Sequence, residues 1–208
     1  SSRQEINRSV SLPHGFSQLE KSGNFNNLRL AAGSGEGEYR PPMFMDSDVS
    51  KWLEAVGYEL AANPDPELEA MANQAIDLLV AAQADDGYLN SYWQVVKPDQ
   101  RWSDMEHGHE LYCAGHLFQA AVAYARGTGD RRLLDIACRV ADNIDSVFGP
   151  DKRHSTPGHP EIEMALIEMY RETGEKRYLD LGIFFLDERG KDHLKAVYSW
   201  TPTKYYQD

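Results

Sequence analysis

The fold is decided by residues 115–144, GHLFQAAVAYARGTGDRRLLDIACRVADNI, because the same pattern returns in residues 158–190, GHPEIEMALIEMYRETGEKRYLDLGIFFLDERG. Each stretch reads Gly-His, an apolar segment, a Thr-Gly-acid turn, a basic pair, Leu-Asp and a second apolar segment. The Thr-Gly pairs begin at positions 128 and 173 and the Leu-Asp pairs at 134 and 179, so both are offset by 45 residues. A period of that size with two helices in each unit predicts a stack of helical hairpins.

The Thr-Gly turns have a local physical reason. Gly129 and Gly174 can adopt the left-handed backbone that ends a helix, and Asp130 and Glu175 favour the start of the next one. A looser third hairpin precedes the repeat, because the apolar residues of 46–60 recur at steps of three and four, and Pro66 follows the breaker NPDP at a first-turn position. Six helices are therefore expected.

Residues 1–45 contrast with the rest of the chain. LPHGF, KSGNFNN, GSGEGEY and RPPM place glycine and proline every few residues, which predicts an irregular amino-terminal arm. The predicted domains are thus this arm and a helical region over 46–208.

Helical hairpins can form an open superhelix that binds protein or a closed ring with a central pocket. The connections favour the ring, because Tyr88, Tyr92, Trp93 and Trp102 gather with histidines before the repeat. Aromatic rings and polar groups at one rim suit a carbohydrate-sized pocket. The alternative that these aromatics cap helix ends stays open.

Charge and hydropathy exclude other classes of partner. The net charge of −12 would repel nucleic acid, and no apolar run is long enough to span a bilayer. No secretory signal is recognisable, so we expect a cytoplasmic location, although a chain that begins Ser-Ser has been trimmed and a targeting segment could be missing.

The segment HGHELYCAGH, residues 107–116, has the composition of a metal site but not the spacing. It is not HExxH, and Cys113 and Cys138 are the only cysteines, 25 residues apart. We therefore expect two free thiols, no metal bound by this chain, and packing roles for Cys113 and His116.

Two histidines stand where helices begin. His109, with Glu110 beside it, precedes one apolar run, and His159 follows a Pro-Gly break, with Glu161 two residues on. All four are candidate substrate-binding residues. Alternatively, Glu161 and Glu163 only favour the helix dipole.

Six strings closely resemble the amino-terminal half of glycoside hydrolase family 127: DSDVSKWLEA, QADDGYLNSYW, HELYCAGHLFQAAVAY, DNIDSVFGP, GHPEIEMALIEMYRETGEKRYLDL and FFLDERG. The resemblance implies an all-α chain forming about half of an (α/α)6 barrel. It also implies hydrolysis of non-reducing β-L-arabinofuranosides with retention, by a cysteine nucleophile held on zinc and a glutamate acid/base. His109 and His159 match family histidines that line the sugar subsite.

The resemblance places the nucleophile, the zinc ligands and the acid/base beyond the end of this chain, and Cys113 and Cys138 do not match the catalytic cysteines. Zinc is therefore expected only in the full-length enzyme, and this chain alone is expected to be inactive. The carbohydrate partner would be an L-arabinofuranoside. A related exo-glycosidase for another plant-polysaccharide sugar and a non-catalytic interaction module remain alternatives. A cut barrel would expose apolar helix faces, some of Ile183 to Leu186 among them, so self-association is expected.

Overall fold

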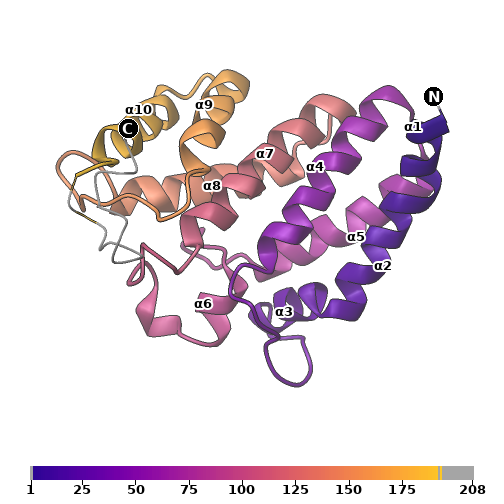
Figure 1. The fold of residues 1–208 in the computed structure, drawn as a ribbon, viewed down its shortest axis with the longest axis horizontal. Coiled ribbons are helices and arrows are strands. Elements are labelled where there is room, and N and C mark those ends of the chain that lie inside the picture. The colour runs from indigo at the N-terminus through magenta and orange to yellow at the C-terminus, as the bar shows by residue number, and fades with distance from the viewer. Residues whose placement is uncertain (1, 192, 194–208) are drawn as a thin grey trace.

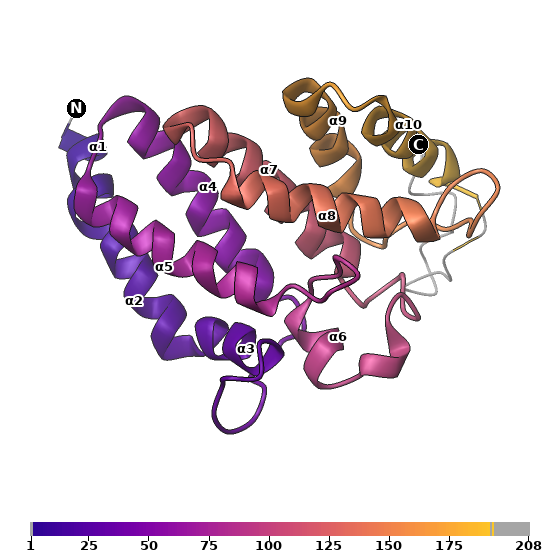
Figure 2. The same cartoon turned by 180° about the vertical axis from the view of Figure 1, so that it is seen from behind.

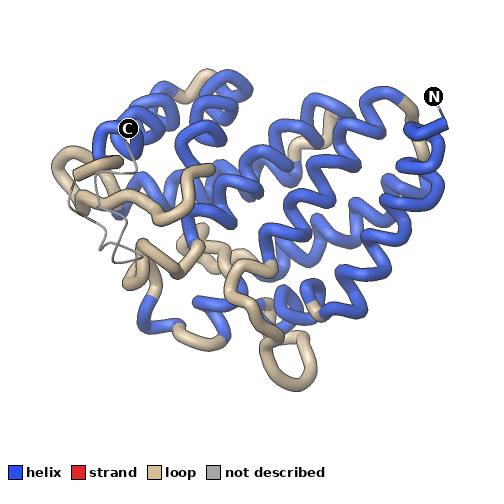
Figure 3. Tube along the Cα trace, viewed as in Figure 1, coloured by secondary structure: helices blue, strands red, loops and turns tan. Residues whose placement is uncertain are grey.

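The computed structural model describes residues 2–191 and 193, and the regular elements of that part of the chain are helices (Figures 1 and 3). The three predicted hairpins are confirmed. They are α4 (Asp46–Ala62) with α5 (Pro66–Ala82), α7 (Glu110–Thr128) with α8 (Arg132–Val147), and α9 (Ile162–Thr173) with α10 (Lys176–Glu188). The end of the predicted 46–208 region lies outside the described residues.

The hairpins stack so that their helices form two layers. The first helices of the hairpins are neighbours, α4 against α7 and α7 against α9, while α8 contacts both α5 and α10. From behind, α5 and α8 lie in front of α4 and α7 (Figure 2). An inner and an outer helix in each hairpin is the arrangement of an (α/α) barrel, so the all-α fold class and the barrel-fragment architecture are confirmed.

The inner helices α4 and α7 approach at their backbones. A Cβ atom at Gly57 would lie 2.8 Å from the Cα of Tyr124, and one at Gly127 would lie 2.2 Å from the carbonyl oxygen of Gly57. Only glycine leaves room for this contact. The two helices are thereby held at the closest spacing that their main chains permit.

The Thr-Gly turns have the predicted geometry. Gly129 ends α7 with φ 80°, and Gly174 ends α9 with φ 77°. In both turns the threonine hydroxyl accepts the N–H of the following acid, Asp130 at 3.1 Å and Glu175 at 3.2 Å. The repeat seen in the sequence is therefore a repeat of hydrogen bonds as well.

The amino-terminal arm is not irregular, and that prediction was wrong for most of its length. It forms α1 (Ser2–Ile6), a turn of π-helix (Asn7–Ser11), α2 (Leu12–Ser22) and α3 (Asn24–Ala31). Residues 32–45 alone are largely irregular. The division of domains at residue 45 is untested and stays a prediction.

The residues that suggested breaks in the arm have other uses. Pro13 lies just after the turn of π-helix, where the main-chain hydrogen bonds already depart from the α-helical pattern, and Gly23 ends α2 in the left-handed conformation. Gly15 lies mid-helix because a Cβ there would come within 2.9 Å of the Trp52 ring. The indole N–H of Trp52 also donates to the carbonyl of Leu12 at 2.9 Å, which fastens the arm to α4.

A long connection from α5 to α7 contains α6 (Ser91–Val95) and one turn of 3-10 helix (Pro98–Gln100). Three aromatic side chains of this connection, Tyr88, Trp93 and Trp102, are buried rather than displayed on a pocket wall. The structure therefore supports the packing role for these three aromatics.

The outward face of the third hairpin carries apolar side chains. Phe184 and Phe185 of α10 are buried, but Ile183 and Leu186 are 44% and 50% exposed, and Met164 of α9 is 57% exposed. Within the described residues, no helix is long and apolar enough to cross a membrane.

Candidate functional site

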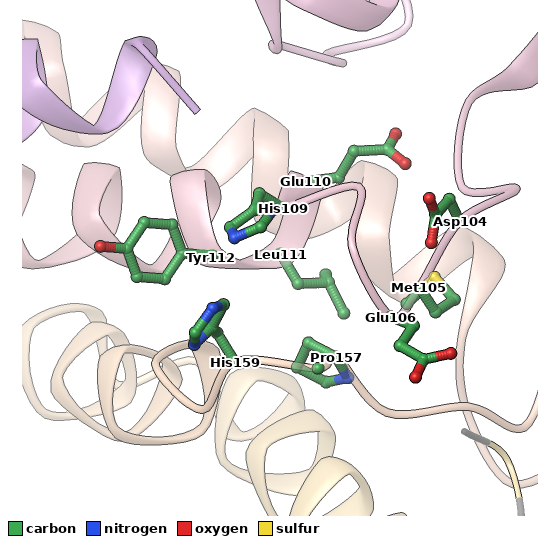
Figure 4. A pocket seen from close by; sticks show the side chains of 10 residues that line it. Asp104, Met105, Glu106, His109, Glu110, Leu111, Tyr112, Pro157 and His159 are labelled. Atoms are coloured by element: carbon green, nitrogen blue, oxygen red, sulfur yellow. The ribbon is translucent and has the colours of Figure 1, made fainter. Parts of the chain in front are cut away.

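A hollow lies between the start of α7 and the loop that precedes α9 (Figure 4). Residues of the loop before α7 and of its first turn form one side, and Pro157, Gly158 and His159 form the other. The two sides are joined by the backbone N–H of Gly158, which donates to the carbonyl of Met105 at 2.9 Å. The hollow is thus assembled by segments about 50 residues apart in sequence.

The hollow brings His109 and His159 together. Their ring centroids are 4.9 Å apart with the planes tilted by 41°, and the ring of Tyr112 lies 5.6 Å from each of them. Phe44, from the segment before α4, packs against the outer side of His109 at 4.9 Å. Two imidazoles and two aromatic rings therefore form one continuous surface.

Burial sets the charge of His109. It lowers the pKa of the imidazole, and the nearby His159 ring lowers it further. A neutral imidazole has one N–H donor and one nitrogen acceptor, which matches the donor and acceptor of a sugar hydroxyl. His109 can therefore contact a neutral polyol as an uncharged ring.

Glu110 is adjacent to His109 in sequence, but the structure does not bring its carboxylate to the two imidazoles. The carboxylate points the other way in Figure 4 and is buried. It accepts hydrogen bonds from the Tyr88 phenol and from the backbone N–H of Trp102. Burial raises the pKa of Glu110 to about 7.

Glu161 lies beside α7 and contacts His116 rather than His159. Its Oε1 is 3.4 Å from the His116 Nδ1. Burial lowers the pKa of His116 to about 4 and raises that of Glu161, so both environments oppose charge and the contact is a weak ion pair at most. Gly115 leaves space for Glu161, since a Cβ there would lie 2.6 Å from its Cγ.

Glu163 has a structural role. Its Oε2 accepts the backbone N–H of Glu161 at 3.0 Å, which supports the start of α9. Its other oxygen pairs with the buried Arg189 guanidinium, whose Nε lies 3.1 Å away. The alternative stated from the sequence, that Glu163 only favours the start of its helix, therefore describes this residue well.

Sequence reasoning missed Lys51. Its ammonium donates to the Tyr112 hydroxyl at 2.9 Å and to the Ser47 hydroxyl at 3.2 Å. The Lys51 to Ser47 spacing of four residues is visible in the sequence, but the contact with Tyr112 spans 61 positions and depends on how α4 crosses α7. Lys51 fixes the Tyr112 ring beside the histidines.

The cysteines are free and do not form a metal site. Cys113 is buried, and burial raises its thiol pKa, which opposes the thiolate that a zinc ion requires. Among residues 2–191 and 193, no group of three or more His, Cys, Asp or Glu could hold a metal ion. The described residues therefore do not fit zinc, and zinc in a longer enzyme stays a prediction.

The hairpins are stacked with inner and outer helices, and a polar and aromatic hollow lies at one end of the inner layer. These two features are those of the class of (α/α)-barrel proteins. The chain matches the family β-L-arabinofuranosidase, GH127 catalytic domain, over residues 1–208, and it belongs to this family of glycoside hydrolases.

Individual relatives agree with the family match. The chain is 47% identical over 178 residues to a non-reducing end β-L-arabinofuranosidase of Bifidobacterium longum subsp. longum, which covers 83% of this chain and 27% of that protein. A GH127 β-L-arabinofuranosidase structure from Geobacillus stearothermophilus T6 has 45% identity and a TM-score of 0.89, covering 91% of this chain and 31% of that one. A second GH127 β-arabinofuranosidase structure has 35% identity and a TM-score of 0.87, covering 95% and 33%. The chain thus spans about a third of the length of these relatives.

Proposed function

We propose that this chain supplies the sugar-binding side of a retaining exo-glycosidase that hydrolyses non-reducing β-L-arabinofuranosides. The observation that carries the proposal is the pair of imidazoles, His109 and His159, packed 4.9 Å apart at the hollow. The names of the relatives supply the sugar, since the Bifidobacterium protein is a β-L-arabinofuranosidase that acts at non-reducing ends.

The side chains at the hollow suit the hydroxyls at one edge of a furanoside, because the hollow itself has a volume of about 10 Å³, room for one water-sized group. The two imidazoles supply hydrogen-bonding nitrogens to the hydroxyls, while the Tyr112 and Phe44 rings exclude water beside them. Each hydroxyl held in this way restricts the ring's rotation and translation before any bond is broken. The role of these residues in the reaction is therefore binding and orientation.

Four carboxylates lie close to the hollow, and none is directed at the two imidazoles. Glu110 is bonded to Trp102 and Glu161 lies beside His116. Asp104 accepts the backbone N–H of His107, and Glu106 points away from both histidines in Figure 4. We therefore propose that the nucleophile and the acid/base lie on a further segment that completes the barrel. Zinc, which the resemblance implies for the longer enzyme, finds no ligand set among the described residues, and no step is assigned to it.

Titration of the isotope-labelled chain with methyl β-L-arabinofuranoside, followed by NMR, tests the proposal. We expect shifts centred on His109 and His159, and weaker binding in His109→Ala and in His159→Ala. Loss of a hydrogen bond to the sugar should weaken binding by on the order of 1 to 3 kcal/mol, roughly 5-fold to 150-fold. His14→Ala, an exposed histidine of α2, is the matched control and should bind as the wild type does.

Methyl β-D-galactopyranoside and an apolar peptide separate the alternatives. Preferential shifts with the pyranoside at the same histidines would favour an exo-glycosidase for another sugar. Binding of the peptide, with no response to either sugar, would favour the helical-hairpin interaction module.

A further inference from the structure

The loop from Arg101 to His109, which ends at the start of α7, has an unusual backbone at both ends. Trp102 has φ 60° and His109 has φ 58°, and these are the two residues other than glycine with positive φ among the described residues. Side chains destabilise that conformation by about 1 to 3 kcal/mol, so surrounding contacts must hold it in place.

Glu110 holds the first of these residues. The backbone N–H of Trp102 lies 2.9 and 2.8 Å from the two carboxylate oxygens of Glu110. The Tyr88 phenol donates to the same carboxylate, and the Arg153 guanidinium donates to the Trp102 carbonyl at 2.7 Å. Trp102 is therefore held on its N–H side by the buried Glu110 carboxyl group and on its carbonyl side by the exposed Arg153 guanidinium.

The far end of the loop is held as well. The indole N–H of Trp93 donates to the carbonyl of Gly108 at 2.9 Å, and the Gly108 N–H donates to the carbonyl of Asp104 at 2.9 Å. A Cβ at Gly108 would lie 2.3 Å from that same Asp104 carbonyl oxygen, so the loop closes tightly on itself. The loop is thus held at both ends, at Trp102 by Glu110 and at Gly108 by Trp93 and Asp104.

The closed loop selects one tautomer of His109. The ring Nδ1 meets the carbonyl oxygen of His107, and a carbonyl can only accept, so Nδ1 carries the proton. Because burial favours the neutral ring, Nε2 then has no proton and can only accept. A hydroxyl bound there must donate its hydrogen.

We infer that Glu110 is a positioning residue: by anchoring Trp102 it holds the loop that fixes His109 as the Nδ1–H tautomer, and Nε2 is thereby preset to accept a hydrogen bond from a sugar hydroxyl. The last part of this role rests on the proposed function, but the tautomer itself does not. Glu110 acts through the loop and does not contact the sugar.

Long-range ¹H–¹⁵N spectra of the His109 ring in the 208-residue chain, recorded near neutral pH without sugar, test the inference. We expect a protonated-type shift at Nδ1 and an unprotonated-type shift at Nε2 in the wild type. Glu110→Asp retains the charge but withdraws the carboxylate from Trp102, so the two nitrogen shifts should move together as tautomers mix. Glu110→Gln retains an acceptor oxygen at the original reach and should restore the wild-type pattern.

Glu106→Asp, the same chemical change as Glu110→Asp within the same loop, is the matched control and should leave the His109 shifts unchanged. An Nε2–H or mixed tautomer in the wild type would overturn the inference, and so would a wild-type pattern in a folded Glu110→Asp variant. The tautomer is measured without sugar, so its outcome is independent of the sugar titration. The expected tautomer in the spectra, together with no binding in the sugar titration, would refute the proposed function alone. Sugar binding at a mixed-tautomer His109 would refute this inference alone.

Discussion

Replacing Gly57 by alanine should destabilise the protein although alanine is the better helix former. In an exposed helix the change would stabilise by about 1 kcal/mol. At Gly57 the new Cβ would lie 2.8 Å from both the Cα and the nitrogen of Tyr124 and 2.9 Å from the carbonyl carbon of Ala123. These are backbone atoms of α7, which cannot rotate away, so α4 and α7 must separate.

The expected magnitude follows from that separation. Overpacking of this kind typically destabilises by about 1 to 3 kcal/mol, and lost contacts along the parted helices add to it. After the gain in helix propensity, we expect a net loss of about 1 to 2 kcal/mol, which lowers the melting temperature by roughly 2 to 8 °C for a chain of this size.

Urea and thermal unfolding followed by circular dichroism measure the effect, and Gly182→Ala is the matched control. Gly182 is also a buried glycine inside a helix, but its new Cβ would meet its closest neighbour, the carbonyl oxygen of Glu163, at 3.3 Å. We expect Gly182→Ala to be close to neutral, because a gain in helix propensity of about 1 kcal/mol offsets this tight contact. If Gly57→Ala lowers the melting temperature no more than Gly182→Ala does, the backbone contact between α4 and α7 is wrong.

Three other outcomes are expected. The 208-residue chain should bind no stoichiometric zinc in elemental analysis after dialysis, and one zinc per chain that is lost in Cys113→Ser would contradict this. Because burial raises the pKa of Glu110 from 4.5 to about 7, the folded state binds this proton more tightly than the unfolded state, so the free energy of unfolding should fall as the pH rises between those values. Urea titrations at about pH 5 and about pH 8 measure this decrease in the free energy of unfolding. We expect the decrease to be larger in the wild type than in Glu110→Gln, by up to about 3 kcal/mol. Equal decreases in the two proteins would refute the buried environment of Glu110. The exposed Ile183 and Leu186 should make the chain self-associate, which light scattering would detect and Ile183→Lys should reduce; a monodisperse wild type would refute that expectation.

The hairpins were predictable because their signals are local. Gly129 and Gly174 each end a helix by their own backbone freedom, and the adjacent acids begin the next helix within two residues. The spacing of the apolar residues then assigns the buried face of each helix. No long-range contact is needed to read either signal.

The amino-terminal arm was mispredicted because the structural roles of its glycines depend on tertiary contacts. Gly15 is a helix-interior residue only because the Trp52 ring occupies the space of its side chain. Trp52 is 37 positions away, and nothing in LPHGF identifies it as the neighbour. Helix propensity alone therefore gave the wrong answer there.

The site was predictable in part for a related reason. His109 stands directly before α7, and His159 lies in the loop that leads into α9 at Ile162. The two helices are neighbours in the stack, and the sequence indicates both positions. The direction of Glu110 was hidden, because the left-handed backbone at His109 turns the chain so that successive side chains diverge. Positive φ is uncommon even at histidine, so the sequence did not indicate this turn, and two residues adjacent in sequence were wrongly expected to share the pocket.

The stacking order of the hairpins also bears on how the protein is made. Inner helix α7 packs on α4, and α9 packs on α7, so each hairpin docks on the one that precedes it in the chain. A ribosome releases the hairpins in that same order, and each emerging pair of helices meets a surface that is already formed. Because such contacts reach no further than the preceding hairpin, 61 positions for Lys51 and Tyr112, folding during synthesis can proceed one hairpin at a time without waiting for segments still to be made.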